Sequence, residues 1–127
     1  MINELAKQVH QNAKDHGFFN EPKNIGEMLC LIHSEVSEAL EADRKGNYYR
    51  GSVYAVVGEN GFPVLDDERF KMIFNSCGIK SSFQDELADI IIRVMDLAAF
   101  KNIDLEAHIK AKMRYNSLRE YKHGKKY

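Results

Sequence analysis

The sequence has no tryptophan and contains only two cysteines and two prolines among its 127 residues. Two thiols are too few for a disulfide framework, and Cys30 and Cys77 do not have the spacing of a zinc or redox motif. No segment approaches the roughly twenty consecutive apolar residues that span a bilayer, and the charged N-terminal stretch lacks the apolar run of a secretory signal. We therefore expect a cytoplasmic protein with reduced thiols and no membrane partner.

An excess of charge of one sign is also missing. Eighteen Lys and Arg residues stand against nineteen Asp and Glu residues, which gives a formal net charge of -1. Proteins that coat DNA or RNA carry a strong basic excess, so this balance predicts no nucleic-acid polymer as a partner. Small charged ligands are compatible with it. The length suits one domain that spans residues 1–127.

Apolar residues recur at the three-to-four spacing of a helix in four segments, which cover residues 2–16, 24–45, 81–100 and 104–123. The first should end at Gly17. Ser81 or Ser82 should cap the third helix, and Asp104 should cap the fourth. The inward faces are predicted from the apolar residues of each segment: Met28, Leu29, Ile32, Val36 and Leu40; Leu87, Ile91, Val94 and Ala98; Leu105, Ile109, Met113, Tyr115 and Leu118. These segments predict an all-α fold, a four-helix bundle.

Residues 46–80 form an insert of a different kind between the second and third helices. They hold five of the eight glycines and a β-prone piece, "SVYAVV". A hairpin or two short strands around "GENG", followed by a short helix over "DDERFKMIF", is our interpretation. Because bundle loops are usually much shorter, a connection of this length indicates a lid, a binding loop or an oligomer contact.

Two pairs of acids border the apolar stripes of the central helices. Glu35 and Glu38 stand at i and i+3, and so do Glu86 and Asp89, so each pair lies on one side of one turn. If the two turns face each other, each like-charged pair costs about 4 kcal/mol at about 4 Å and an effective dielectric near 20. Oxygen ligands without Cys or His suit Mg²⁺ or Mn²⁺. The alternative is that both pairs are ordinary acids on solvated helix faces, and spacing alone leaves it open.

The ordered strings "SEVSEALEADRKG" and "DELADIIIRVMDLA" resemble the MazG-like all-α nucleoside triphosphate pyrophosphohydrolases, which carry an ExxE pair on one helix and an ExxD pair on the next. "HGFFNEPKNIGEML" and "KMRYNSLREYKHGKK" extend the resemblance to most of the chain outside the insert. It implies a bundle of the all-α NTP pyrophosphatase type, assembled as a homodimer or homotetramer. It also implies cleavage of a (deoxy)nucleoside triphosphate between its α and β phosphates, giving the monophosphate and pyrophosphate.

The resemblance assigns roles to individual residues. The four acids Glu35, Glu38, Glu86 and Asp89 match the ligands that hold Mg²⁺ against the triphosphate, and Lys112 and Asn116 match residues that contact phosphate or sugar.

The residues themselves add further candidates. Lys112, Asn116 and Arg119 follow at i, i+4 and i+7, so they would share one face of the fourth helix. Glu38 is our candidate for the general base. The resemblance also implies a role for Phe18, because some relatives stack an aromatic ring on the base at this place; the alternative is that Phe18 closes the end of the bundle. Asn24 either touches the ligand or caps its helix.

One departure from the family pattern is the 47 residues between Glu38 and Glu86, where relatives have a much shorter loop. It leaves the substrate and the assembly open. Hydrolysis of phosphoribosyl-ATP is a related alternative, because that family shares the bundle. A non-catalytic helical module, in which the acids form salt bridges, is an alternative of another class. A di-iron bundle needs Glu-x-x-His on two helices, and His33 and His108 have no such spacing after a Glu.

Overall fold

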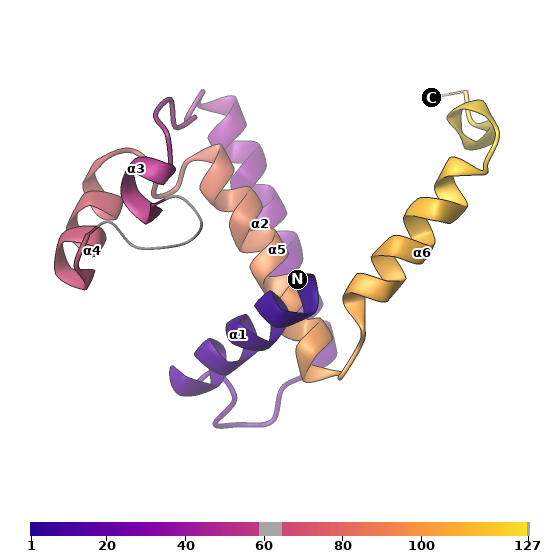
Figure 1. Cartoon of the computed structure of the whole chain (residues 1–127), viewed down its shortest axis with the longest axis horizontal. Coiled ribbons are helices and arrows are strands. Elements are labelled where there is room, and N and C mark those ends of the chain that lie inside the picture. The colour runs from indigo at the N-terminus through magenta and orange to yellow at the C-terminus, as the bar shows by residue number, and fades with distance from the viewer. Residues whose placement is uncertain (59–64, 127) are drawn as a thin grey trace. The chain divides into compact units, whose positions relative to one another are not determined.

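The structure is a computed structural model, and it describes residues 1–58 and 65–126. Every regular element in those ranges is helical: α1 (Ile2–Asp15), α2 (Ile25–Arg44), α3 (Tyr54–Val57), α4 (Asp67–Ser76), α5 (Phe83–Phe100), α6 (Leu105–Ser117) and the 3₁₀ helix η2 (Tyr121–Gly124) (Figure 1). The all-α prediction is confirmed for this part of the chain. Among the described residues, no helix is both long and apolar enough to cross a membrane.

The chain divides into two compact units. One consists of Met1–Ile25 and Ile92–Tyr127, and the other of Gly26–Ile91. The first therefore contains α1, the second half of α5, α6 and η2, whereas the second contains α2, α3, α4 and the first half of α5. We predicted that these helices assemble into a single domain and form a four-helix bundle, and both statements stay predictions.

In the second unit, α2 lies beside the first half of α5 (Figure 1). Its buried residues are Met28, Glu35, Ala39 and Ala42, which recur at i, i+7, i+11 and i+14 and so form one narrow face. Of the predicted inward face, Met28 is buried as expected, but most of the other residues are not. Leu29, Val36 and Leu40 remain about half exposed, which places the buried face about 100° around the helix from the predicted one. Glu35 consequently lies in the middle of the buried face.

Ser82 fixes the start of α5. Its side chain is fully buried, and its hydroxyl accepts a hydrogen bond from the Asp85 amide at 3.2 Å. The Asp85 carboxylate in turn accepts a hydrogen bond from the Ser81 amide at 2.9 Å. Because the N-cap residue bonds the third amide of its helix, Ser82 is the cap, and the sequence had left Ser81 as the alternative.

The two ends of the insert are joined at its base. The Tyr49 amide donates to the Gln84 side-chain oxygen at 3.0 Å, and the Gln84 amide group donates back to the Tyr49 carbonyl at 2.9 Å. Asn47 adds two more bonds, from its side chain to the Ser81 carbonyl and from the Phe83 amide to its own carbonyl, both 2.8 Å. These four bonds tie residues 47–49 to the start of α5.

The β-prone piece "SVYAVV" is helical, so the strand predicted there is wrong. Residues 54–57 form α3, which contacts α4 and buries Val56. Packing of Val56 overrides the β preference of the valines, since that preference depends on context. The predicted short helix is confirmed as α4, which Asp66 caps by accepting the Arg69 amide at 2.9 Å. Of the "GENG" turn, residues 59–61 lie outside the described residues.

In the first unit, α1 ends before Gly17, whose positive φ of 84° confirms the predicted stop. Asp104 caps α6 by accepting the Ala107 amide at 3.0 Å, also as predicted. Glu106 joins α6 to the start of α1, because it accepts from the Met1 amino group at 2.8 Å and from the Ile2 amide at 2.7 Å.

The inward face predicted for α6 is wrong over its second half. Leu105 and Ile109 are partly buried, but every described residue from Lys110 to Lys126 is exposed. Met113 and Leu118 are 65% and 77% exposed. Helical spacing predicted the helix correctly, but spacing does not tell whether a neighbour covers the apolar positions.

Candidate metal centre

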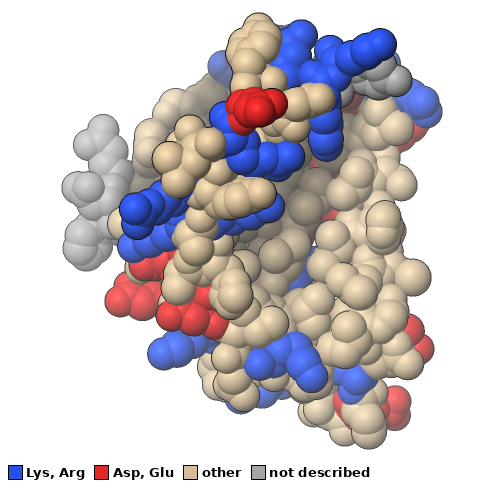
Figure 2. Space-filling model, turned by 90° about the vertical axis from the view of Figure 1, so that its right-hand side faces the viewer, with Lys and Arg blue, Asp and Glu red and all other residues tan. Residues whose placement is uncertain are grey.

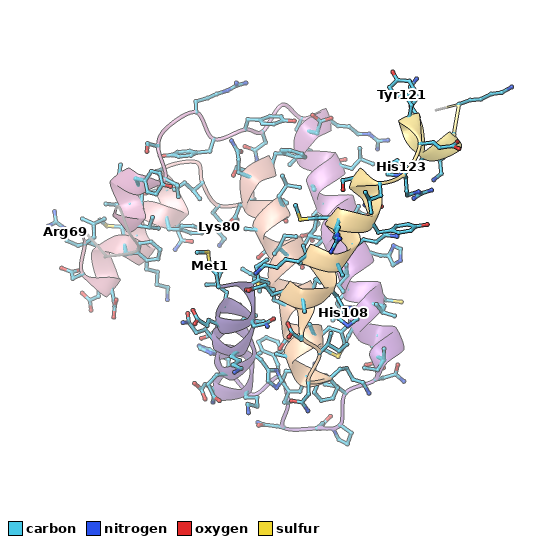
Figure 3. The ribbon with its side chains drawn as sticks, turned by 45° about the vertical axis from the view of Figure 1, so that its right-hand side comes forward. Met1, Arg69, Lys80, His108, Tyr121 and His123 are labelled. Carbon is cyan, nitrogen blue, oxygen red and sulfur yellow. The ribbon has the colours of Figure 1, made fainter. Side chains whose placement is uncertain are left out.

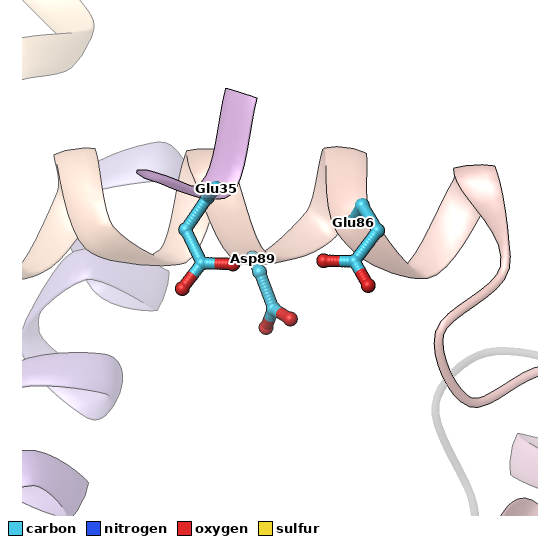
Figure 4. A group of neighbouring side chains, drawn as sticks. All are labelled: Glu35, Glu86 and Asp89. Carbon is cyan, nitrogen blue, oxygen red and sulfur yellow. The ribbon is translucent and has the colours of Figure 1, made fainter. Parts of the chain in front are cut away.

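Three of the four predicted acids come together between α2 and the first half of α5. Glu35, Glu86 and Asp89 each offer a carboxylate oxygen that lies within 4.8 Å of the other two. Figure 4 shows the three side chains with their carboxylates turned to the same side. The i, i+3 spacing places Glu86 and Asp89 on one turn of α5, while Glu35 comes from the buried face of α2.

Two of these carboxylates are buried. Glu35 is 8% exposed and Glu86 is 7% exposed, whereas Asp89 is intermediate. At 4.8 Å and an effective dielectric near 20, each ionised pair would repel by about 3 kcal/mol. A domain with a total stability of about 5–15 kcal/mol does not tolerate several such pairs without a cation or a bound proton.

The arrangement raises the pKa of the Glu86 carboxyl. Burial, the neighbouring charges of Glu38 and Asp89, a hydrogen bond with Glu38 and the charge of Glu35 raise its pKa to about 7. Burial disfavours the charged form, and negative neighbours add to that effect. The Glu86 carboxyl therefore holds a proton in the folded protein up to neutral pH when no cation is bound.

One oxygen of Glu86 has no hydrogen-bond partner among the described residues. Its Oε2 is buried and accepts no bond. Buried polar atoms are nearly always paired, and an unpaired one calls for an explanation such as an ion. The donor set is all carboxylate oxygen, which suits Mg²⁺ or Mn²⁺. Three oxygens bound to one octahedral Mg²⁺ include at least two neighbouring pairs about 3 Å apart, so from separations of up to 4.8 Å the side chains would close by up to about 2 Å.

Glu38, the fourth predicted acid, occupies a different position. Its side chain is exposed, and it lies outside the group of three. It is nevertheless a neighbour of Glu86, since it forms a hydrogen bond with that carboxyl. An exposed carboxylate beside a buried acidic group is suited to exchanging protons with water, whereas its role as a ligand stays a prediction.

The predicted phosphate-binding residues belong to the other unit. Lys112 and Asn116 lie in α6 and are exposed, but α6 ends at Ser117, so Arg119 does not continue their helical face. Lys112 and Arg119 instead meet over one ring. The Lys112 Nζ atom is 4.9 Å from the centre of the Tyr115 ring, and the Arg119 guanidinium carbon is 5.6 Å from it.

Phe18 and Asn24 both lie in the connection between α1 and α2. Phe18 is 63% exposed, and the Lys23 Nζ atom is 5.7 Å from the centre of its ring. The ring is accessible to a ligand, and both stacking on a base and closing the end of the bundle stay predictions. Asn24 directly precedes α2, as a cap or a ligand contact would require.

Sequence reasoning missed Tyr115 as the residue that gathers Lys112 and Arg119. The signal was present, because a tyrosine at i+3 from a lysine on one helix brings its ring beneath the ammonium group.

Comparison with protein-family models, curated proteins and solved structures finds no match to this chain. The family resemblance therefore rests on the residues quoted from the sequence.

Proposed function

We propose that the protein is a Mg²⁺-dependent nucleotide pyrophosphohydrolase that cleaves a (deoxy)nucleoside triphosphate between its α and β phosphates and removes unwanted nucleotides. The observation that carries the proposal is the group of Glu35, Glu86 and Asp89, with a buried Glu86 oxygen that lacks a partner. Mn²⁺ is the expected substitute for Mg²⁺.

Each residue has a defined task in this proposal. Glu35, Glu86 and Asp89 hold the cation, which supplies charge neutralisation on the phosphoryl oxygens and a more acidic water. Glu38 accepts the proton of the attacking water, since it is exposed and adjoins Glu86. Lys112, Asn116 and Arg119 bind the phosphates, and Phe18 stacks on the base.

Unit Gly26–Ile91 also supports assembly into a homodimer or homotetramer. Leu29, Val36, Leu40, Leu87 and Ile91 are 44–55% exposed. On each helix these residues are rotated by about 100–140° about the helix axis from the buried acid, which is Glu35 in α2 and Glu86 in α5. Because α2 and α5 run in opposite directions, equal rotations bring both sets to the same side of the helix pair. A second copy would bury this apolar surface.

The test is pyrophosphate release from a panel of canonical and modified triphosphates, with and without Mg²⁺. Glu86→Gln and Asp89→Asn should reduce turnover by at least about a hundredfold, while Glu41→Gln, an exposed glutamate of α2, the helix that carries Glu35, should leave it unchanged. Orthophosphate as the first product would reject cleavage between the α and β phosphates. Activity on phosphoribosyl-ATP alone would select the related alternative.

The non-catalytic module is separated by a titration with Mg²⁺ or Mn²⁺. Acids that form salt bridges are hydrogen-bonded to their cationic partners, whereas Glu86 Oε2 has no hydrogen-bond partner among the residues described. A cation site should raise the melting temperature with increasing Mg²⁺. An unchanged melting temperature in the millimolar range, together with no turnover, would favour the scaffold.

A further inference from the structure

The charge of this chain is unevenly distributed. We define the basic arm as residues 110–126, the second part of α6 and the segment after it. It holds seven Lys and Arg residues against one Glu, a net charge of +6, which leaves -7 on the remaining 110 residues. Figure 2 shows Lys and Arg side chains gathered in the upper part of the view, where the C-terminal segment lies. The near-zero total therefore conceals a strongly basic segment.

The basic arm is open to solvent over its whole described length. Every residue from Lys110 to Lys126 is exposed, and its two tyrosines, Tyr115 and Tyr121, are 57% and 89% exposed. Tyr121 lies beyond the end of α6, as does His123 (Figure 3). Both rings are therefore accessible for stacking on a ligand.

Cations and rings alternate along the basic arm. Lys112 and Arg119 both lie over Tyr115, and the Lys122 Nζ atom is 5.7 Å from the centre of the Tyr121 ring. Beyond α6 the chain turns back on itself, because the Arg119 guanidinium donates to the His123 carbonyl at 3.4 Å and the His123 amide donates to the Glu120 carbonyl at 2.7 Å. The second tyrosine is thereby held close to the end of the helix.

The apolar residues of the arm do not continue the stripe of Leu105, Ile109 and Met113. Met113 and Leu118 are five positions apart, which places them about 140° apart around a helix. An amphipathic helix that enters a membrane surface or a hydrophobic groove presents its apolar residues on one face. The arrangement of this arm does not match that requirement.

We propose that the basic arm binds single-stranded nucleic acid, with Lys and Arg contacting successive phosphates and Tyr115 and Tyr121 stacking on unpaired bases. A positive track interleaved with exposed aromatic rings is the pattern by which proteins hold single strands without reading sequence. The prediction of no polymeric nucleic-acid partner followed from the total charge. This proposal departs from it because the charge is concentrated in the arm.

The test is fluorescence anisotropy with a labelled sixteen-nucleotide oligo-dT, in EDTA at low salt, so that hydrolysis plays no part. The wild type should bind, and the slope of log K against log salt should be about -3 if about four phosphates are neutralised. The double variant Tyr115→Leu/Tyr121→Leu should bind at least about tenfold more weakly. Tyr54→Leu, a 60% exposed tyrosine of the insert, is the matched control and should bind like the wild type.

Three results would overturn the proposal. The first is no binding of the oligonucleotide at low salt, and the second is equal affinity for a duplex of the same length together with no effect of the tyrosine variant. The third is that the arm binds anionic phosphatidylserine vesicles, or a second copy of the chain, in place of the oligonucleotide. Glu86→Gln separates this inference from the proposed enzyme, since it should lose turnover and keep its affinity for oligo-dT.

Discussion

Replacing Glu86 by glutamine should make the metal-free protein more stable at neutral and alkaline pH. In the folded protein the pKa of Glu86 is about 7, against an ordinary value of 4.5. Folding therefore favours the protonated form. Below pH 4.5 the carboxyl is protonated in both states and this group contributes nothing against folding. As pH rises through 7, the unfolded chain has already released its proton, whereas the folded chain must ionise a buried group.

The size of the effect follows from the two pKa values. A difference between 4.5 and about 7 corresponds to about 3 kcal/mol of folding free energy that is lost between pH 4.5 and pH 8. Glutamine has nearly the same volume and does not ionise, so the variant should not lose it. The stability of Glu86→Gln relative to wild type should therefore rise by up to about 3 kcal/mol over this range.

Urea unfolding in EDTA at several pH values measures the difference directly. Histidines titrate in the same range, but they are common to both proteins, so the comparison isolates Glu86. Glu41→Gln should follow the wild-type curve. Saturating Mg²⁺ should stabilise the wild type at pH 8 far more than it stabilises Glu86→Gln. Parallel stability curves for wild type and Glu86→Gln would refute the argument that the buried cluster strains the metal-free fold.

Three further predictions concern contacts outside the acids. Ser82→Ala should lower the free energy of unfolding by about 1 kcal/mol, measured by urea unfolding, because it removes the buried cap of α5; Ser37→Ala, on the exposed side of α2, should not lower it. Glu106→Gln should reduce stability at neutral pH but not near pH 2. The reason is that hydrogen bonds to the Met1 amino group and the Ile2 amide lower the pKa of Glu106 to about 2, so the stabilisation by Glu106 is present above pH 4.5 and fades below it. Acid unfolding of wild type and variant, followed by circular dichroism, would reveal this difference in stability, and identical curves would exclude it. Gln84→Ala should remove both bonds to Tyr49, cost about 1 kcal/mol and speed proteolysis within residues 50–80; unchanged cleavage would show that the base of the insert is held by other contacts.

Local signals in the sequence predicted the helices well. The helix ends are set by local signals at Gly17, Asp104 and the Ser81–Ser82 pair. These residues act on neighbours within four positions, so their effect can be predicted from the sequence without knowing the fold. The piece "SVYAVV" was misread because packing decides its conformation: α3 contacts α4, and Val56 is buried. Tertiary packing of that kind leaves no periodic trace in the sequence.

The buried face of α2 shows why the site was only partly predictable. Counting apolar residues selects Met28 correctly but also Leu29, Val36 and Leu40, which are half exposed, whereas the structure buries Glu35 with Met28, Ala39 and Ala42. A hydrophobicity rule cannot choose a face centred on a glutamate, because burial of an acid is unfavourable until a proton or cation is included. The i, i+3 pairs did identify the correct acids, since their chemistry and not their hydrophobicity carries the signal.

The paired bonds between Tyr49 and Gln84 have a consequence for how this chain tolerates change. They close the insert where it leaves α2 and returns to α5, so a longer or shorter segment between residues 50 and 80 would not shift the turn of Glu86 against the turn of Glu35. The length of the insert is thereby separated from the helical register on which the acids depend. Exposed positions between residues 50 and 80 can therefore diversify, or be exchanged by design, provided that buried side chains such as Val56 and Ile79 are kept.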